Sequence, residues 1–147
     1  MKYLLDTCVV SELVSKKPDN QVLEFIRSLD EEKTYMSVIT IGEVKHGIDL
    51  LSDRRKKEKL LEWLTDDLLI RFRGKVINVD KQIMYCWSAM TALLVKSGQP
   101  MPIMDSLIAA TCKSNNLRLL TRNEKDFKNV DVNIINPWKH NNTTEMT

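Results

Sequence analysis

The stretch YLLDTCVVSELV at residues 3–14 decides the class of fold. Its apolar opening ends at Asp6-Thr7, and the apolar residues that follow recur with helical spacing. We therefore predict a short strand at residues 2–5, a turn, and a helix over residues 8–15. A strand that leads directly into a helix is typical of α/β proteins, because parallel strands need helical crossovers between them.

The same alternation of strands and helices continues along the rest of the chain. An uncertain segment at residues 53–71 is either one long helix or a hairpin of two. We see no internal repeat or linker, so the sequence predicts one α/β domain with a mainly parallel sheet. The further predicted strands are 35–39, 76–79, 118–120 and the edge strand 134–135, and the further predicted helices are 19–29, 40–51, 81–96, 103–114 and a short one at 123–127.

Composition excludes several classes of protein. The 147 residues are 43% apolar and 29% charged, as in one ordinary globular domain. No apolar run approaches the roughly 20 residues that span a bilayer, so we expect a cytoplasmic protein without membrane contact. Cys8, Cys86 and Cys112 are far apart and odd in number, and we expect them to be reduced. The net charge of +2 is too small to indicate a nucleic-acid partner by itself.

Four acidic residues have similar local settings. Asp6 follows the first predicted strand, Glu43 lies one turn into a helix, Asp105 begins another helix, and Asp126 follows a late strand. Each has an ordinary explanation when taken alone: a helix cap for Asp6, a capping box of Thr40 with Glu43, a helix dipole for Asp105, and a surface acid for Asp126. Ligands of open α/β sheets bind beyond the carboxyl ends of the strands, so we expect the four acids to converge there.

A convergent cluster of carboxylates suits a hard divalent cation. Mg²⁺ and Mn²⁺ prefer oxygen ligands, and they can activate a bound water for attack on a phosphodiester. Histidine chemistry has little support, because a pair would need His46 together with His140 in the polar tail. Neither a nucleophile elbow nor a glycine-rich phosphate loop is present. The sequence therefore favours metal-dependent hydrolysis.

Four segments of the chain carry a family resemblance. They are YLLDTCVVSEL at 3–13, SVITIGEVKHG at 37–47, PIMDSLIAATC at 102–112 and LLTRNEKDF at 119–127. In order and spacing they resemble the motifs of PIN-domain ribonucleases, most nearly those of VapC-type toxins of type II toxin–antitoxin systems. The resemblance runs from Lys2 through INPW at 135–138. It implies a PIN-like three-layer α/β/α domain over residues 1–139, and we expect residues 140–147 to be a disordered tail.

The resemblance also implies roles for the acidic residues. Asp6, Glu43 and Asp105 match the acids that hold Mg²⁺ or Mn²⁺, although Glu43 is also a candidate for positioning the attacking water. Together with Asp126 they form the expected catalytic cluster. The two hydroxyl positions that usually support this cluster in the family are Thr7 and Thr121 of this chain.

The late corner of the site, which is the position of the fourth acid, can be assigned to either of two residues. Relatives place a carboxylate either directly after the Thr-Arg pair or three positions later, which here means Asn123 or Asp126. Asn123 brings no charge, although its side-chain carbonyl can bind a water or the metal's water shell. Asp126 is therefore the candidate for the fourth acid, and the alternative is a site that works with three acids. Arg122 is the candidate for an RNA phosphate contact, with a surface salt bridge as the alternative.

The expected function is therefore metal-dependent endoribonuclease activity on RNA, in the toxin of a toxin–antitoxin pair. The resemblance implies an antitoxin protein that inserts into the acidic groove, and a homodimer. One close variant is a PIN nuclease without an antitoxin. Two further interpretations are a PIN-fold RNA-binding or regulatory protein without cleavage activity, and a receiver-like phosphorylation module, which also uses strand-end aspartates with Mg²⁺.

Overall fold

A five-stranded parallel sheet forms the centre of the molecule. The computed structural model of the chain describes residues 1–139, and its strand order is β3-β2-β1-β4-β5 with every neighbouring pair parallel. The predicted α/β class and parallel sheet are confirmed. The strands are β1 (Tyr3–Leu5), β2 (Thr34–Ser37), β3 (Val76–Ile77), β4 (Arg118–Leu120) and β5 (Ile134–Ile135).

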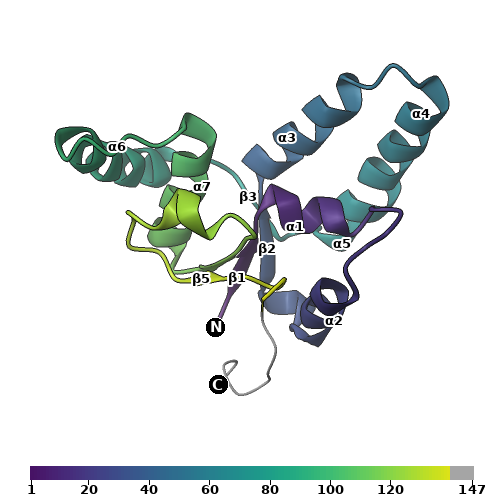
Figure 1. The fold of residues 1–147 in the computed structure, drawn as a ribbon, viewed down its shortest axis with the longest axis horizontal. Helices are drawn as coiled ribbons and strands as arrows, with labels where there is room; N and C mark the ends of the chain where they lie inside the picture. The colour runs from purple at the N-terminus through teal and green to yellow at the C-terminus, as the bar shows by residue number, and fades with distance from the viewer. Residues whose placement is uncertain (140–147) are drawn as a thin grey trace.

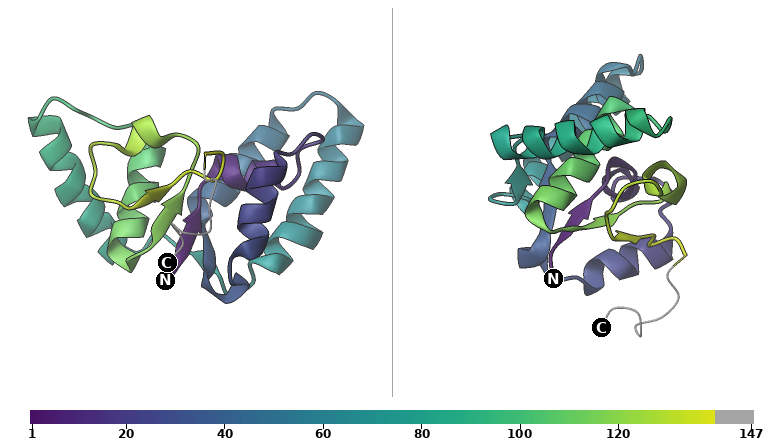
Figure 2. Two further views of the ribbon diagram at one scale, coloured as in Figure 1. Left: turned by 60° about the horizontal axis from the view of Figure 1, so that its bottom comes forward. Right: turned by 90° about the vertical axis from the view of Figure 1, so that its left-hand side faces the viewer.

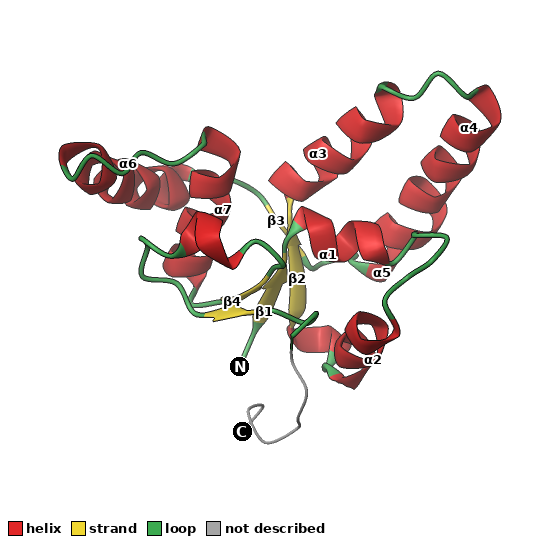
Figure 3. Ribbon diagram, viewed as in Figure 1, coloured by secondary structure: helices red, strands yellow, loops and turns green. Residues whose placement is uncertain are grey.

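Helices cover both faces of this sheet, which gives three layers (Figure 1). Helices α6 and α7 lie on one side and helices α1 to α5 on the other, as the turned views also show (Figure 2). The sheet is enclosed between the two helical layers (Figure 3). The helices are α1 (Thr7–Glu12), α2 (Asn20–Ser28), α3 (Val38–Asp49), α4 (Arg54–Glu62), α5 (Leu69–Arg71), α6 (Lys81–Lys96) and α7 (Ile103–Asn115), with 3₁₀ turns at Glu31–Lys33 and Glu124–Phe127.

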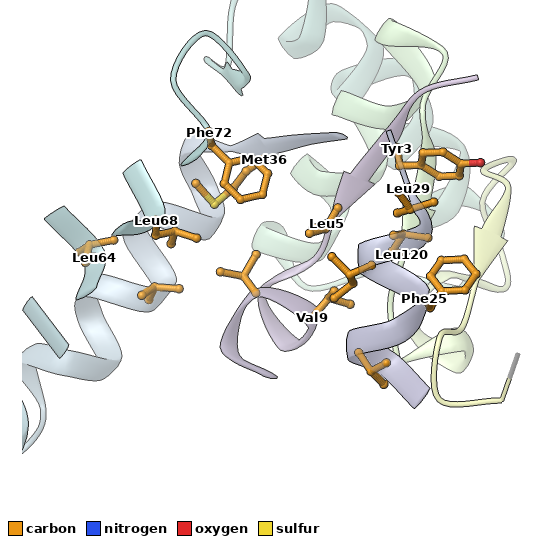
Figure 4. Close-up of a cluster of buried hydrophobic side chains, with 14 of the residues drawn as sticks. Tyr3, Leu5, Val9, Phe25, Leu29, Met36, Leu64, Leu68, Phe72 and Leu120 are labelled. Atoms are coloured by element: carbon orange, nitrogen blue, oxygen red, sulfur yellow. The ribbon is translucent and has the colours of Figure 1, made fainter. Parts of the chain in front are cut away.

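Alternate residues of the central strands supply two hydrophobic cores. Leu5 and Leu120 point into the core under α1, α2 and α3, where Phe25 and other large side chains pack against them (Figure 4). Leu4 and Leu119, one residue earlier in each strand, point into the core under α6 and α7. Successive side chains of a strand point to opposite faces, so a sheet that is buried on both sides needs continuous apolar strands.

The second strand ends earlier than the sequence predicts. We predict a strand through Ile39 and a helix opened by Thr40, but α3 begins at Val38 and Ser37 caps it by accepting the Ile39 amide at 3.0 Å. The capping box of Thr40 with Glu43 is therefore wrong. Ser37 caps the first turn of α3, so Glu43 lies beyond that turn and its side chain is available for tertiary contacts.

The ambiguous segment at residues 53–71 is one continuous helical stretch. Helix α4 runs into a π-helical turn at Trp63–Leu68, and α5 follows without a break. The first helix is shorter than predicted, ending at Glu12. The three cysteines are free, as expected, whereas the predicted tail at 140–147 lies outside the described residues.

Among residues 1–139, no helix combines the length and apolar character needed to cross a bilayer.

Candidate active site

Asp6 and Thr121 lie side by side where the strand order of the sheet reverses. Strands β1 and β4 are neighbours, with Leu5 paired to Leu120, so the residues that follow both strands emerge at the same edge. Thr121 Oγ1 donates to Asp6 Oδ2 at 2.8 Å. Such a reversal is where open α/β sheets bind ligands, because the crossovers leave in opposite directions and open a crevice.

Asp6 has two structural roles at once. Its Oδ1 accepts the Thr7 amide at 2.9 Å and so caps α1, which is the ordinary explanation that its sequence position also suggests. The residue is only 6% exposed. Burial raises the pKa of Asp6 and the nearby charge of Asp126 raises it further, while hydrogen bonds from Thr121, Thr7 and Cys8 lower it. The chain therefore holds a buried acid in place with donors that favour its ionised form.

Thr7 connects Asp6 to Glu43. Its backbone amide donates to the capping carboxylate of Asp6. Its hydroxyl Oγ1 donates to Glu43 Oε1 at 2.7 Å and contacts Thr40 Oγ1 at 3.3 Å. Helix α3 thus brings the half-buried Glu43 against the start of α1. Thr40, which we predict as a helix cap, lies fully buried in this contact instead.

Asp105 joins the other acids electrostatically. It stands in the first turn of α7, where the helix dipole favours an anion, yet its pKa is raised to about 6. Burial is the largest cause, followed by the negative charges of Asp6, Asp126 and Glu43. The other three acids singled out in the sequence, which come from three separate segments of the chain, therefore all lie within electrostatic range of Asp105.

The late corner is built by the loop after β4. The Asn123 amide donates to Thr121 Oγ1 at 3.1 Å, and the Asp126 amide donates to the Asn123 carbonyl at 3.0 Å. Both residues are exposed, and Asn123 does not cap the following 3₁₀ turn with its side chain. The charge of Asp126 nevertheless raises the pKa of Asp6 and Asp105, so Asp126 interacts electrostatically with both acids.

The donor set suits a hard cation that keeps part of its water shell. Within residues 1–139, no group of three or more His, Cys, Asp or Glu side chains lies closely enough together to hold a metal ion by itself. Mg²⁺ does not need one, because it usually retains several waters and binds through one or two carboxylates. The repulsion among four neighbouring acids would be relieved by such a cation. The residues therefore fit a hydrated divalent metal.

Sequence reasoning misses one neighbour of Asp6 and leaves one basic side chain undecided. Cys8 Sγ lies 3.9 Å from Asp6 Oδ2 and accepts the Arg122 amide at 3.5 Å, although the sequence predicts only that this cysteine is reduced. Its place in the first turn of the helix that Asp6 caps is the signal available in the sequence. The exposed Arg122 has its guanidinium 5.3 Å from the centre of the Trp138 ring, and it forms no salt bridge with any other residue in the described range 1–139.

Comparison with known proteins identifies the family. The model of the PIN domain family matches residues 3–133, so the chain belongs to the PIN domain family. Toxin FitB of Neisseria gonorrhoeae is 33% identical over 135 residues, which are 92% of this chain and 97% of FitB. VapC ribonuclease Y4jK of Sinorhizobium fredii is 29% identical over 136 residues, with coverage of 92% and 97%. The predicted family resemblance is confirmed, and nucleases of this kind generally depend on divalent metals.

A solved structure supports the same assignment. The crystal structure of FitAcB from Neisseria gonorrhoeae superposes with a TM-score of 0.89 at 33% identity, and the match covers 94% of this chain and 99% of that chain. The agreement extends over the three-layer fold with its parallel sheet. The predicted PIN-like architecture is therefore confirmed.

Proposed function

We propose that this protein is a metal-dependent endoribonuclease that hydrolyses RNA phosphodiester bonds as the toxin of a type II toxin–antitoxin pair. The observation that carries the proposal is the electrostatic convergence of the other three acids on Asp105, whose pKa is raised by burial and then by Asp6, Asp126 and Glu43. Membership of the PIN domain family and similarity to Toxin FitB and a VapC ribonuclease support it.

In this proposal Asp6, Asp105 and Glu43 hold Mg²⁺ or Mn²⁺ partly through its bound waters, since no three acids of the described range lie close enough to ligate it together. Asp126 completes the cluster. The bound cation supplies Lewis-acid stabilisation of the phosphate and an acidified water for attack. Thr121 orients Asp6 through its 2.8 Å hydrogen bond and favours the ionised form of the carboxylate against the effect of burial. Thr7 orients Glu43 through its 2.7 Å hydrogen bond to Oε1. Among residues 1–139 no hydrogen bond occupies Glu43 Oε2, so that oxygen is available for a water or the metal. The exposed Arg122 is the proposed contact for a flanking RNA phosphate.

The proposed partners follow from the same function. An antitoxin protein covers the acidic site, and the toxin acts as a homodimer. The toxin name of FitB, which is matched over nearly its full length, supports the antitoxin partner. The free cysteines support a location in the reducing cytoplasm. We propose residues 1–139 as the nuclease domain.

Charge-neutral variants of the cluster test the proposal. Asp6→Asn and Asp105→Asn remove a negative charge with little change in volume, so we expect folded proteins that no longer cleave total RNA in Mn²⁺. Asp131→Asn makes the same change at an exposed residue outside the cluster and serves as the control. EDTA should abolish wild-type cleavage. Cleavage by Asp6→Asn at the wild-type rate would overturn the proposal.

The second candidate function is RNA binding without cleavage, and Asn123 is the observation that favours it, since an amide stands where some relatives carry an acid. Retention of RNA by the wild-type protein with no cleavage in Mg²⁺ or Mn²⁺ would select this function. The receiver-like interpretation has little support, because receivers have the strand order 2-1-3-4-5 and this sheet has the order 3-2-1-4-5.

A further inference from the structure

The last described residues of the chain fold back over the loop that carries Asp126. We call Asn136–Lys139 the closing segment and Arg122–Asp126 the late loop. Strand β5 lies beside β4, and the Thr121 amide donates to the Ile135 carbonyl at 3.1 Å. The closing segment and the late loop therefore leave the same edge of the sheet from adjacent strands.

Asn136 makes the two contacts between these segments that involve a buried side chain. The residue is buried, with only 8% of its surface exposed, and its Nδ2 donates to Glu124 Oε2 at 3.2 Å and reaches the Arg122 carbonyl at 3.5 Å. Its Oδ1 accepts the Trp138 amide at 2.9 Å. One buried amide group thus joins Arg122 and Glu124 of the late loop to the turn of the closing segment. A buried polar group with its partners in place is costly to change.

Two further contacts join the same segments, and each has an exposed partner. The Arg122 guanidinium stacks over the Trp138 ring at 5.3 Å, and Trp138 itself packs on the core under α1 and α2. Lys139 Nζ pairs with Glu124 at 3.1 Å, with side chains 75% and 44% exposed. Exposed ion pairs contribute little to stability, so the buried Asn136 is the contact on which the loop depends.

The late loop in turn reaches the acidic cluster through its backbone. Thr121 Oγ1 accepts the Asn123 amide and donates to Asp6, and the Asn123 carbonyl accepts the Asp126 amide. A displacement of Glu124 or Arg122 is therefore transmitted to Asn123, which lies between them in the chain, and onward to Asp126. The path from Asn136 to the candidate active site consists of direct hydrogen bonds and adjacent residues.

We propose that Asn136 is a positioning residue of the nuclease site, which holds the late loop through Glu124 and Arg122 so that Asp126 stays at the acidic cluster. The inference rests on the proposed function and extends the site to the INPW segment at residues 135–138. Asn136 does not contact the cluster itself. Residues that orient the groups around a metal typically change metal affinity or activity by roughly 10–100-fold when replaced.

An exchange of hydrogen-bonding groups tests this role. In Asn136→Asp the Nδ2 donor becomes an oxygen that faces the Glu124 carboxylate, so we expect Mn²⁺ affinity and kcat to fall about 10-fold or more while KM for RNA changes little. Glu124→Gln restores a donor on the opposite side. The double variant should therefore recover most of both losses, because the amide introduced by Glu124→Gln donates to the carboxylate introduced by Asn136→Asp.

The control is Asn133→Asp, which adds the same charge at an exposed residue of the same region. It should bind Mn²⁺ and cleave RNA as the wild type does. Circular dichroism and thermal melting establish that each variant is folded. If Asn136→Asp does not fold, Glu124→Ala replaces it, since that change removes the same partner from a partly exposed position, and we expect a smaller loss of Mn²⁺ affinity in the same direction.

Three results would overturn the proposal. They are wild-type Mn²⁺ affinity and kcat in folded Asn136→Asp, a double variant no better than the single one, and unchanged Mn²⁺ affinity in the Glu124→Ala replacement. Failure of the proposed function is separate, because it would be seen as an absence of RNA cleavage by the wild type. In that case hydrogen exchange at the Asp126 amide still tests the contact: faster exchange in Asn136→Asp supports the positioning role, and unchanged exchange contradicts it.

Discussion

Thr121 and Asp6 are joined by a 2.8 Å hydrogen bond between residues 115 positions apart in the chain. Both residues are buried, at 0% and 6% exposed. The bond crosses the point where the strand order reverses and fixes the orientation of the acid that follows β1. Because it stabilises the ionised carboxylate, it lowers the pKa of Asp6 against the opposing effect of burial.

Thr121→Val should destabilise the protein by about 2 kcal/mol at pH 7, since a buried charged acceptor loses its donor at constant side-chain volume. The hydrogen bond favours the ionised form, so its contribution is present above the pKa of Asp6 and is lost as the pH falls through it. Urea denaturation at several pH values measures the free energy of unfolding of the wild type and the variant. Thr111→Val is the matched control, because Thr111 is equally buried and donates to the neutral Leu107 carbonyl at 2.8 Å. Equal, pH-independent losses in both variants would contradict this interpretation.

Thr7→Val should weaken metal binding by about 10-fold through the loss of the donor to Glu43. Thr7→Ser keeps the hydroxyl and should behave as the wild type. Isothermal titration with Mn²⁺ compares the three proteins directly. If the serine variant binds as poorly as the valine variant, the hydroxyl is not what positions Glu43.

Much of the fold was predictable because it depends on local patterns. Strands β4 and β5 and helices α6 and α7 fall within a residue of their predicted limits, since apolar periodicity and turn residues mark their ends. The junction at Ser37 was predicted wrongly. Val38 and Ile39 are apolar and β-branched, so they extend the strand pattern even though Ser37 already caps the helix.

The candidate site was predictable only in part, for a related reason. Asp6 and Asp105 were found because strand ends and helix starts can be located locally. The contacts that hold the site depend on tertiary structure: Thr7 meets Glu43 across 36 positions, and Cys8 meets the Arg122 amide across 114. No local periodicity encodes such pairs. Asn136 was likewise missed as a site residue, because its partners are known only once β5 lies beside β4.

Asp105→Asn should stabilise the metal-free protein at pH 8 while abolishing cleavage. The folded-state pKa of Asp105 is raised from 3.8 to about 6. The folded protein therefore binds this proton more tightly than the unfolded chain, and stability falls as the pH rises through this window and stays lower above it. We expect a gain on the order of 1 kcal/mol, reduced by solvent screening of a half-exposed group.

Urea denaturation in EDTA at pH 4 and pH 8 measures this difference. The gain should be absent at pH 4, where the aspartic acid is largely protonated in the folded state. At pH 8, added Mn²⁺ should make the wild type more stable than the variant, because the metal binds only the folded wild type. A variant less stable than the wild type at pH 8 in EDTA would show that the repulsion among the acids is not the dominant effect at Asp105.

The late corner is best resolved by exchanging its two residues. Asp126→Asn removes a charge that raises the pKa of Asp6 and Asp105, so both pKa values should fall, and cleavage should drop about 10-fold if Asp126 belongs to the metal's outer shell. Asn123→Asp should strengthen Mn²⁺ binding, because its backbone is tied to Thr121 beside Asp6. The double variant, which carries both changes, keeps the number of charges and moves one of them from position 126 to position 123. Cleavage restored by the double variant means that the site needs a fourth charge at either place, whereas full activity of Asp126→Asn alone would leave three acids as the working site.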